Sequence, residues 1–284
     1  MYLCSAMKPI SIAVLDLYEG HANEGMRCIV DILNQMKGMH QSPIEWQIFD
    51  VRQKLELPGT EFDLYISSGG PGSPTDSAGM EWDTLYFNWL ASMVEWNNNV
   101  LHLHKKFVFF ICHSYQLACR FFDIGQVTKR KSTAFGVFPI HMIDQAAEEP
   151  VFSGLNDPFF GVDSRDYQVI QPNWNVISDM GAKMLCLEKE RPHVDLERAI
   201  MAIRFNPYMI GTQFHPEADP EGMSRYLLQE EKKAIVIQQH GQEKWSSMIE
   251  QLNDPEKIRL TYSNILPNFI MQSIAALENP YSLS

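Results

Sequence analysis

Residues 106–122, KFVFFICHSYQLACRFF, constrain the fold of this chain more than any other segment. The run 107–111 is wholly apolar and rich in aromatic and β-branched side chains, which indicates a strand buried on both faces. From Leu117 to Phe122 the apolar residues recur at helical spacing. We therefore expect a parallel strand, a tight turn at Cys112 and a helix. That arrangement holds a nucleophile at the carboxyl edge of many α/β sheets.

Two interpretations of Cys112 follow from this position. A helix N-terminus supplies backbone N–H groups and a positive dipole end, which favour the reactive thiolate form of cysteine. A free cysteine is also among the most buried residue types and commonly packs as a small hydrophobe. A histidine elsewhere in the chain is needed to distinguish the two interpretations.

Composition narrows the classes of function. The chain has 284 residues, 45% of them hydrophobic, and a net charge of −12, which disfavours nucleic acid or an anionic membrane surface as a partner. Its five cysteines have no framework or CxxC spacing, so we expect a reducing compartment and no metal. The N-terminal residues do not resemble a secretory signal, and no apolar run is long enough to span a bilayer. These features predict a cytoplasmic enzyme or binding protein with no cofactor.

The remaining pattern predicts an α/β fold with a helical C-terminal part. Strands are expected at 10–15, 45–50 and 62–67, and helices at 23–38 and 81–99. Shorter strands, antiparallel or at the sheet edge, are expected at 134–142, 167–170, 175–178, 183–187 and 199–205. Helical patterns follow at 222–249 and 255–277, the second containing Pro267. We predict a domain over residues 8–220 and a helical extension over residues 221–284, packed on that domain or on a second subunit.

The turn Ser68-Gly69-Gly70-Pro71-Gly72 follows the expected strand 62–67. Successive glycines let backbone N–H groups face a ligand, which is how a site for an oxyanion forms. The turn matches neither GxxxxGK[ST] nor GxGxxG, so it does not predict a phosphate loop. A plain Gly/Pro loop is the alternative.

A second informative segment is His215-Pro216-Glu217. In an extended chain, residues two apart point to the same side, so His215 and Glu217 are expected to lie together. A carboxylate beside an imidazole orients the ring and stabilises its protonated form. Together with the turn at Cys112, this pair predicts a Cys-His-Glu triad.

These three motifs, in this order, resemble those of the class I (triad-type) glutamine amidotransferases. The resemblance covers about residues 10–220 and is closest to the group that contains the amidotransferase part of GMP synthase. It implies a flavodoxin-like, mainly parallel α/β sheet with helices on both faces. It also implies hydrolysis of the glutamine side-chain amide.

The resemblance implies a role for each site residue. Cys112 is the nucleophile, His215 the base and then the acid, and Glu217 the residue that orients His215. The oxyanion hole is formed by backbone N–H groups of the Gly69-Gly70 turn and of His113. Gln116 matches the family position that contacts the substrate glutamine.

The chain departs from the family pattern around the nucleophile and the substrate. The family turn Gly-x-Cys-x-Gly has Phe110 and Ser114 here in place of both glycines. The family Glu-x-Gly segment is present as Ala134-Phe135-Gly136. The family Ser-His-x-Asp-x-Val segment appears as residues 164–169, SRDYQV, without its His and Asp. These departures concern the substrate more than the type of reaction.

Three functions remain open at this point. The first is an amidase that acts on glutamine or a related γ-glutamyl compound through a Cys112 thioester. The second is a γ-glutamyl peptidase or hydrolase with a substrate other than glutamine. The third is an inactive binding module on an amidotransferase scaffold. No synthetase module follows in the sequence, so a separate ammonia-accepting synthetase is a further expected partner, and the apolar C-terminal helices favour a homodimer.

Overall fold

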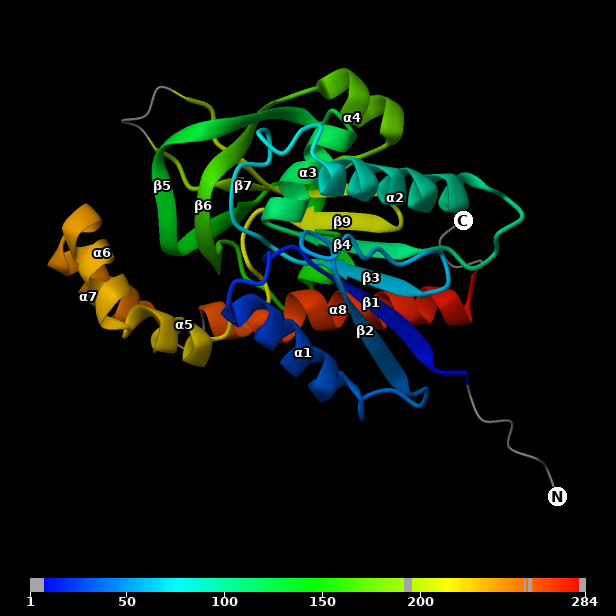
Figure 1. Cartoon of the computed structure of the whole chain (residues 1–284), viewed down its shortest axis with the longest axis horizontal. Helices are drawn as coiled ribbons and strands as arrows, with labels where there is room; N and C mark the ends of the chain where they lie inside the picture. Colours follow the sequence, from blue (N-terminus) through cyan, green and yellow to red (C-terminus); the bar gives the residue numbers. More distant parts are fainter. Residues whose placement is uncertain (1–7, 192–195, 253, 255–256, 281–284) are drawn as a thin grey trace.

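A nine-stranded sheet lies between two layers of helices in the computed structural model of the chain, which describes residues 8–191, 196–252, 254 and 257–280 (Figure 1). The strands are β1 Ile10–Asp16, β2 Ile44–Asp50, β3 Leu64–Ser67, β4 Phe107–Ile111, β5 Gly125–Met142, β6 Phe159–Pro172, β7 Lys183–Glu188, β8 Ile200–Asn206 and β9 Met209–Thr212. The helices are α1 Glu24–Met36, α2 Glu81–Asn98, α3 His113–Phe121, α4 Trp174–Met180, α5 Pro220–Leu227, α6 Glu230–His240, α7 Gln242–Leu252 and α8 Ile258–Glu278. Short 3-10 turns lie at Asp144–Ala146 and Pro150–Phe152.

The sheet has a parallel half and an antiparallel half. Its strand order is β2-β1-β3-β4-β9-β8-β7-β5-β6. The pairs from β2 to β9 are parallel, and those from β9 to β6 are antiparallel. The predicted α/β sheet with helices on both faces is confirmed, and its later strands are antiparallel, as expected.

One predicted element is wrong. Residues 175–178, predicted to form a strand, lie within α4. The run of apolar residues there is short, and only Ile177 is buried. Gly181, with φ of 64°, ends the helix in the left-handed conformation that glycine adopts without strain. The segment therefore forms a short helix that ends at Gly181, despite the strand propensity of Val176 and Ile177.

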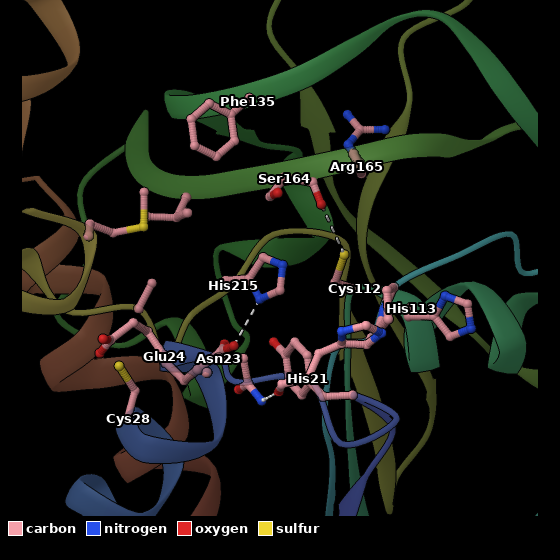
Figure 2. Close-up of a pocket in the computed structure, with 18 of the residues that line it drawn as sticks. His21, Asn23, Glu24, Cys28, Cys112, His113, Phe135, Ser164, Arg165 and His215 are labelled. Carbon is pink, nitrogen blue, oxygen red and sulfur yellow. Dashed lines mark hydrogen bonds and ion pairs between the residues drawn. The ribbon is translucent and has the colours of Figure 1, made fainter. Parts of the chain in front are cut away.

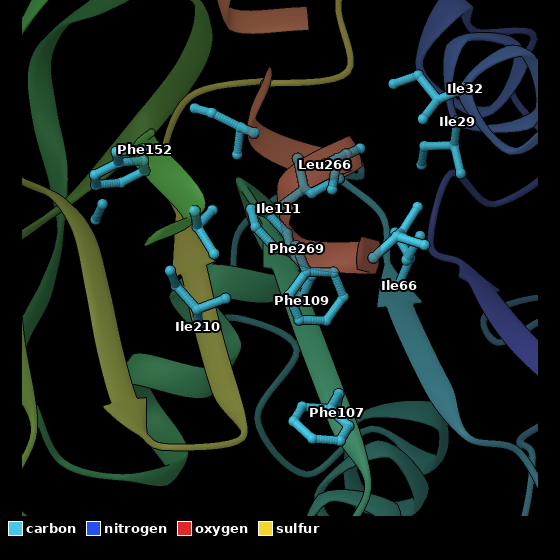
Figure 3. Packing of buried hydrophobic residues seen from close by; sticks show 14 of the residues in the cluster. Ile29, Ile32, Ile66, Phe107, Phe109, Ile111, Phe152, Ile210, Leu266 and Phe269 are labelled. Atoms are coloured by element: carbon cyan, nitrogen blue, oxygen red, sulfur yellow. The ribbon is translucent and has the colours of Figure 1, made fainter. Parts of the chain in front are cut away.

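Strand β4 is buried on both faces because its side chains alternate between two cores. Phe109 points to the face covered by α1 and α8, where its ring meets that of Phe269 in α8 at a centroid distance of 5.2 Å (Figure 3). Phe110 points to the opposite face, covered by α2, α3 and α4, and packs edge-on against Phe205. The parallel strand predicted from the run 107–111 is confirmed by these contacts and by its pairing with β3 and β9.

The predicted helical segment 222–249 forms three helices, α5 to α7, that pack together. They cover the β5–β6 hairpin through a small apolar cluster that includes Val137, Val162, Leu227 and Met248. Helix α8, which contains Pro267, lies instead against the central sheet. The start of the predicted helix 255–277, like Cys4, lies outside the described residues, and the division at residue 220 stays a prediction.

Candidate active site

The nucleophile turn predicted at Cys112 joins β4 to α3. Cys112 has φ of 48° and ψ of −96°, a conformation rarely adopted by residues other than glycine. Its N–H donates to the carbonyl of Thr212 in β9 (2.8 Å), and its own carbonyl accepts from the N–H of Gln116 (3.0 Å). Strained backbone held by fixed neighbours is typical of functional sites. The turn places the side chain of Cys112 beyond the end of β4, at the N-terminus of α3.

His215 lies beside this turn (Figure 2), and Glu217 lines the same cavity. Nδ1 of His215 is 2.8 Å from Oε1 of Glu217, and the Glu217 side chain is fully buried. The backbone N–H of His215 donates to the carbonyl of Val162 in β6 (2.8 Å), which fixes the histidine next to the hairpin. Burial lowers the pKa of His215, but Glu217 and the Cys112 thiolate outweigh burial, so the pKa stands well above 6.5. The imidazole is therefore held in its protonated form when the thiol is ionised.

The first turn of α1 closes around the carboxylate of Glu217. A Cβ added at Gly25 would lie 2.4 Å from the Tyr18 hydroxyl oxygen and 3.1 Å from Oε1 of Glu217. Gly25 is thus needed for space and not for its backbone conformation. Tyr18 is partly buried, and burial together with Glu217 and Cys112 raises its pKa well above 10, which keeps its hydroxyl protonated. Residues 18–25 were not predicted to belong to the site.

Replacing Gly25 by alanine is expected to lower activity about tenfold or more, because the added methyl displaces Tyr18 and disturbs the Glu217 carboxylate. The measurement is kcat/KM for amide hydrolysis. Gly38→Ala is the matched control, since no atom lies within 4 Å of a Cβ added there. Equal activities of the two variants would contradict the close approach of α1 to Glu217.

The Gly69-Gly70 turn packs tightly against His215 and Leu17. A Cβ on Gly69 would lie 2.8 Å from Cε1 of His215, and one on Gly70 would lie 2.5 Å from the carbonyl oxygen of Leu17. No other residue fits at either position without moving the backbone or the imidazole. Gly70 lines the same cavity as Cys112 and His113, the first residue of α3, whereas Gly69 contributes through its close approach to His215.

The side chain of His113 plays a different part from its backbone. Its imidazole is buried against Trp82, at a ring-centroid distance of 6.2 Å. Burial, reinforced by Arg52 and Arg120, lowers its pKa to about 3, so the ring is neutral. The resemblance assigned only the backbone N–H of His113 to the site, and the burial of the ring is consistent with that assignment.

The cavity at the triad has a volume of about 770 Å³. Its walls come from the β1–α1 loop, the glycine turn, the β5–β6 hairpin and the start of α5. Phe135, Val162 and Met223 form an apolar part of the lining, and Glu24, Asp166 and Asp219 an acidic part. Among the described residues, no group of three or more His, Cys, Asp and Glu side chains is placed to hold a metal ion.

A family model and solved structures match this chain. The model described as "Glutamine amidotransferase class-I" matches residues 31–234. The chain belongs to the class I glutamine amidotransferase family. A search among curated proteins finds no sequence match.

The solved structures support the fold of this amidotransferase-family chain. A glutamine amidotransferase from Thermotoga maritima superposes with a TM-score of 0.67 at 14% identity, covering 94% of this chain and 99% of its own. A protein from Thermoplasma acidophilum, described as one of the subunits of a GMP synthase, gives 0.58 at 14% identity, covering 96% and 98%. The glutaminase domain of a Trypanosoma brucei CTPS with bound acivicin gives 0.52 at 12% identity, covering 73% and 86%. At these identities the likeness concerns the fold alone.

Ser114 stands where the family turn has its second glycine, and its hydroxyl holds the turn together. Oγ donates to the carbonyl of Ser67 in β3 (2.7 Å) and accepts from the N–H of Ile111 (2.8 Å). The side chain is fully buried. A hydroxyl that joins two strands thus replaces the close packing that glycine allows.

Phe110 stands where the family turn has its first glycine. It pairs with Gly211 on β9, and a Cβ at Gly211 would lie 3.0 Å from Cβ of Phe110 and 2.9 Å from the ring of Tyr115. The space for the phenylalanine is therefore supplied by the missing side chain on the neighbouring strand. The turn at Cys112 thus accommodates both Phe110 and Ser114, and Cys112 keeps its strained conformation.

Ser114→Ala is expected to destabilise the protein by about 1–3 kcal/mol, because it removes a buried hydroxyl with two partners. Urea unfolding measures the difference in free energy. Ser92→Ala is the control, since the Ser92 hydroxyl donates only to Trp89 within α2 and is partly exposed. The control should change stability by about 0.5 kcal/mol or less. If Ser114→Ala lowers the free energy of unfolding no more than Ser92→Ala does, the Ser114 hydroxyl does not stabilise the turn at Cys112.

The departure at residues 164–169 produces a buried ion network. Arg165, where the family has histidine, contacts both carboxylate oxygens of Asp163 (2.8 and 2.9 Å) and lies 3.4 Å from Glu188. Arg130 contacts Glu188 as well (3.0 Å). The positive charge of Arg165 is thus paired with the carboxylates of Asp163 and Glu188. The nearest group of this segment to the nucleophile is the carbonyl of Ser164, 3.9 Å from the sulfur of Cys112.

Gln116 lines the cavity and is hydrogen-bonded to Gln213. Its Nε2 donates to Oε1 of Gln213 (3.0 Å), and Nε2 of Gln213 lies 3.7 Å from the sulfur of Cys112. Gln213 lies two residues before His215 and was not predicted as a site residue. Its position one strand from the nucleophile is visible only once β9 is known to lie beside β4.

Proposed function

We propose that this chain is a cysteine-dependent amidase of the class I amidotransferase family, acting on the side-chain amide of glutamine or a γ-glutamyl compound. The observation that carries the proposal is the placement of Cys112. It has a strained backbone at the N-terminus of α3, and it lines the same cavity as His215, whose Nδ1 is held by Glu217. Nucleophile, base and orienting carboxylate are thus within reach of one another.

The geometry supports a two-step reaction. The Cys112 thiolate attacks the amide carbon, and the negative charge formed on the carbonyl oxygen is stabilised by backbone N–H groups of Gly70 and His113. Protonated His215 gives its proton to the departing nitrogen as the C–N bond breaks, which leaves a γ-glutamyl thioester and free ammonia or amine. His215 then takes a proton from water, whose oxygen attacks the thioester. The sulfur leaves as the thiolate, and the product is a free carboxylate.

A second candidate substrate class is a γ-glutamyl peptide or conjugate. It is favoured by the size of the cavity, about 770 Å³, which lies in the range of sites that hold drug-sized ligands. The apolar lining at Phe135, Val162 and Met223 suits a substituent on the amide nitrogen better than bare ammonia. With such a substrate the acyl part is the same and only the leaving amine differs.

The partner follows from the product. If free ammonia is released, a separate synthetase that accepts it is the expected partner, and if a substituted amine is released, none is needed. A homodimer and a cytoplasmic location stay predictions. The described residues contain no helix that is both long and apolar enough to cross a membrane.

The test is a substrate profile with a covalent trap. Glutamate, ammonia and amine release are measured with glutamine and with γ-glutamyl dipeptides of increasing side-chain size, alongside mass spectrometry after treatment with a glutamine-like chloroketone. Release of glutamate and a label on Cys112 are expected. Preference for dipeptides over glutamine would select the second substrate class. A folded, reduced protein that releases no product from any substrate and takes no label would overturn the proposal in favour of a binding module.

A further inference from the structure

We propose that Gln213 is a catalytic residue whose side-chain amide donates a hydrogen bond to the Cys112 thiolate, and that Gln116 positions this amide. The inference deepens the proposed function, since it assumes that Cys112 reacts as a thiolate. It assigns a role to an amide pair, Gln116 and Gln213, that links α3 to the end of β9.

The first support is geometric. Nε2 of Gln213 lies 3.7 Å from Sγ of Cys112, within range for a hydrogen bond to sulfur, and Oε1 of Gln213 accepts from Nε2 of Gln116 at 3.0 Å. In this orientation the oxygen of the Gln213 amide faces Gln116 and its nitrogen faces the sulfur. A donor facing the sulfur stabilises the ionised form of the nucleophile.

The second support is burial. Gln213 is fully buried and Gln116 is 3% exposed, so water does not replace either bond. A glutamine side chain loses conformational freedom when it is fixed, and an amide is costly to bury without partners. The two amides bond each other, and the network ends on the sulfur of Cys112.

The backbone holds both ends of this contact in register. The N–H of Cys112 donates to the carbonyl of Thr212, the residue before Gln213 (2.8 Å), and the N–H of Gln213 donates to the carbonyl of Met201 in β8 (2.8 Å). The distance between amide and sulfur is thus set by strand pairing and not by a mobile loop. Such pre-organised donors stabilise charge without reorganisation during the reaction.

The other groups around the sulfur of Cys112 act on the thiolate differently from the Gln213 amide. The carbonyl of Ser164, 3.9 Å away, accepts a hydrogen bond only from the protonated thiol. Protonated His215, whose charged form the thiolate favours, is the positive partner. Among the side chains the structure describes around Cys112, Gln213 supplies a neutral donor that favours the thiolate whatever the charge of His215.

The test measures the thiolate directly and does not depend on the substrate. The rate of Cys112 alkylation by iodoacetamide is followed from pH 5 to 10 in the full-length protein, with mass spectrometry to confirm the site. Gln213→Met is expected to slow alkylation near neutral pH about tenfold and to move the pH midpoint of the profile upward. Gln116→Met should slow it about threefold, and the double variant should match Gln213→Met, because Gln116 acts through Gln213.

Controls separate this role from a purely structural one. Gln168→Met removes another buried amide, one that accepts from Arg130, and should leave the alkylation profile unchanged. If Gln213→Met does not fold, Gln213→Glu keeps the shape and should slow alkylation further, because it places a carboxylate near the sulfur. An unchanged profile in a folded Gln213 variant overturns the proposal. A shifted profile in a protein that hydrolyses no substrate would keep it and reject the proposed amidase instead.

Discussion

Cys112→Ala is expected to abolish release of glutamate from any substrate the wild-type protein hydrolyses, with a loss of about 1,000-fold or more in kcat. No other described residue that lines the cavity combines a cysteine side chain with a strained backbone at a helix N-terminus. Circular dichroism and thermal unfolding should be little changed, because alanine tolerates the positive φ of residue 112 no worse than cysteine. The measurement is glutamate release under saturating substrate.

Cys119→Ala is the matched control for this result. Cys119 lies in α3 as well, but it is fully buried, and burial raises the pKa of its thiol. Its thiol therefore stays protonated and unreactive, and kcat/KM should change by less than about threefold. Substantial activity in Cys112→Ala, or a comparable loss in Cys119→Ala, would remove Cys112 from the role of nucleophile.

Glu217→Gln is expected to lower kcat about 1,000-fold while the protein stays folded. The glutamine is isosteric but offers no negative charge, so His215 loses both its orienting partner and the stabilisation of its protonated form. The reference value is the wild-type kcat with the same substrate. A modest effect, below about tenfold, would mean that burial of His215 and not Glu217 fixes the imidazole.

The same variant makes a prediction about pH. In the wild type, burial lowers the pKa of His215 while Glu217 and the thiolate raise it to well above 6.5. The stabilisation from charged His215 is thus fully present below pH 6.5 and is lost as pH rises through the raised pKa. In Glu217→Gln the burial effect prevails, so the titration midpoint of the His215 ring resonances should fall below that of the wild type. NMR of the imidazole protons measures it, and an unmoved midpoint would contradict the assigned cause.

Most of the parallel half of the fold and the three motifs were predictable because their signals are local. The run 107–111, the helical spacing after Cys112 and the alternation in His215-Pro216-Glu217 each depend on a few adjacent residues. The confirmed fold then brings these segments together at one sheet edge. The site roles of Cys112, His215 and Glu217 stay proposals, although the structure places all three residues around one cavity.

What could not be predicted depends on contacts between distant segments. Gly211 on β9 makes room for Phe110 on the neighbouring strand β4, and Gly25 in α1 makes room for Glu217. Gln213 reaches the nucleophile only because β9 pairs with β4. The helix at 174–180 was missed because its apolar residues suit either a strand or a short helix, and the glycine that ends it carried the deciding information.

The position of β9 has a consequence for how the protein is made. It is the last strand in the described part of the chain, yet it occupies the middle of the sheet between β4 and β8. During synthesis the edge of β4 stays unpaired until residue 212 has left the ribosome, so a long apolar edge is exposed on the nascent chain. The triad is likewise incomplete until residue 217 emerges. Truncated products should therefore be prone to aggregate and devoid of hydrolytic activity, and efficient production should depend on chaperones that shield β4 until the chain is finished.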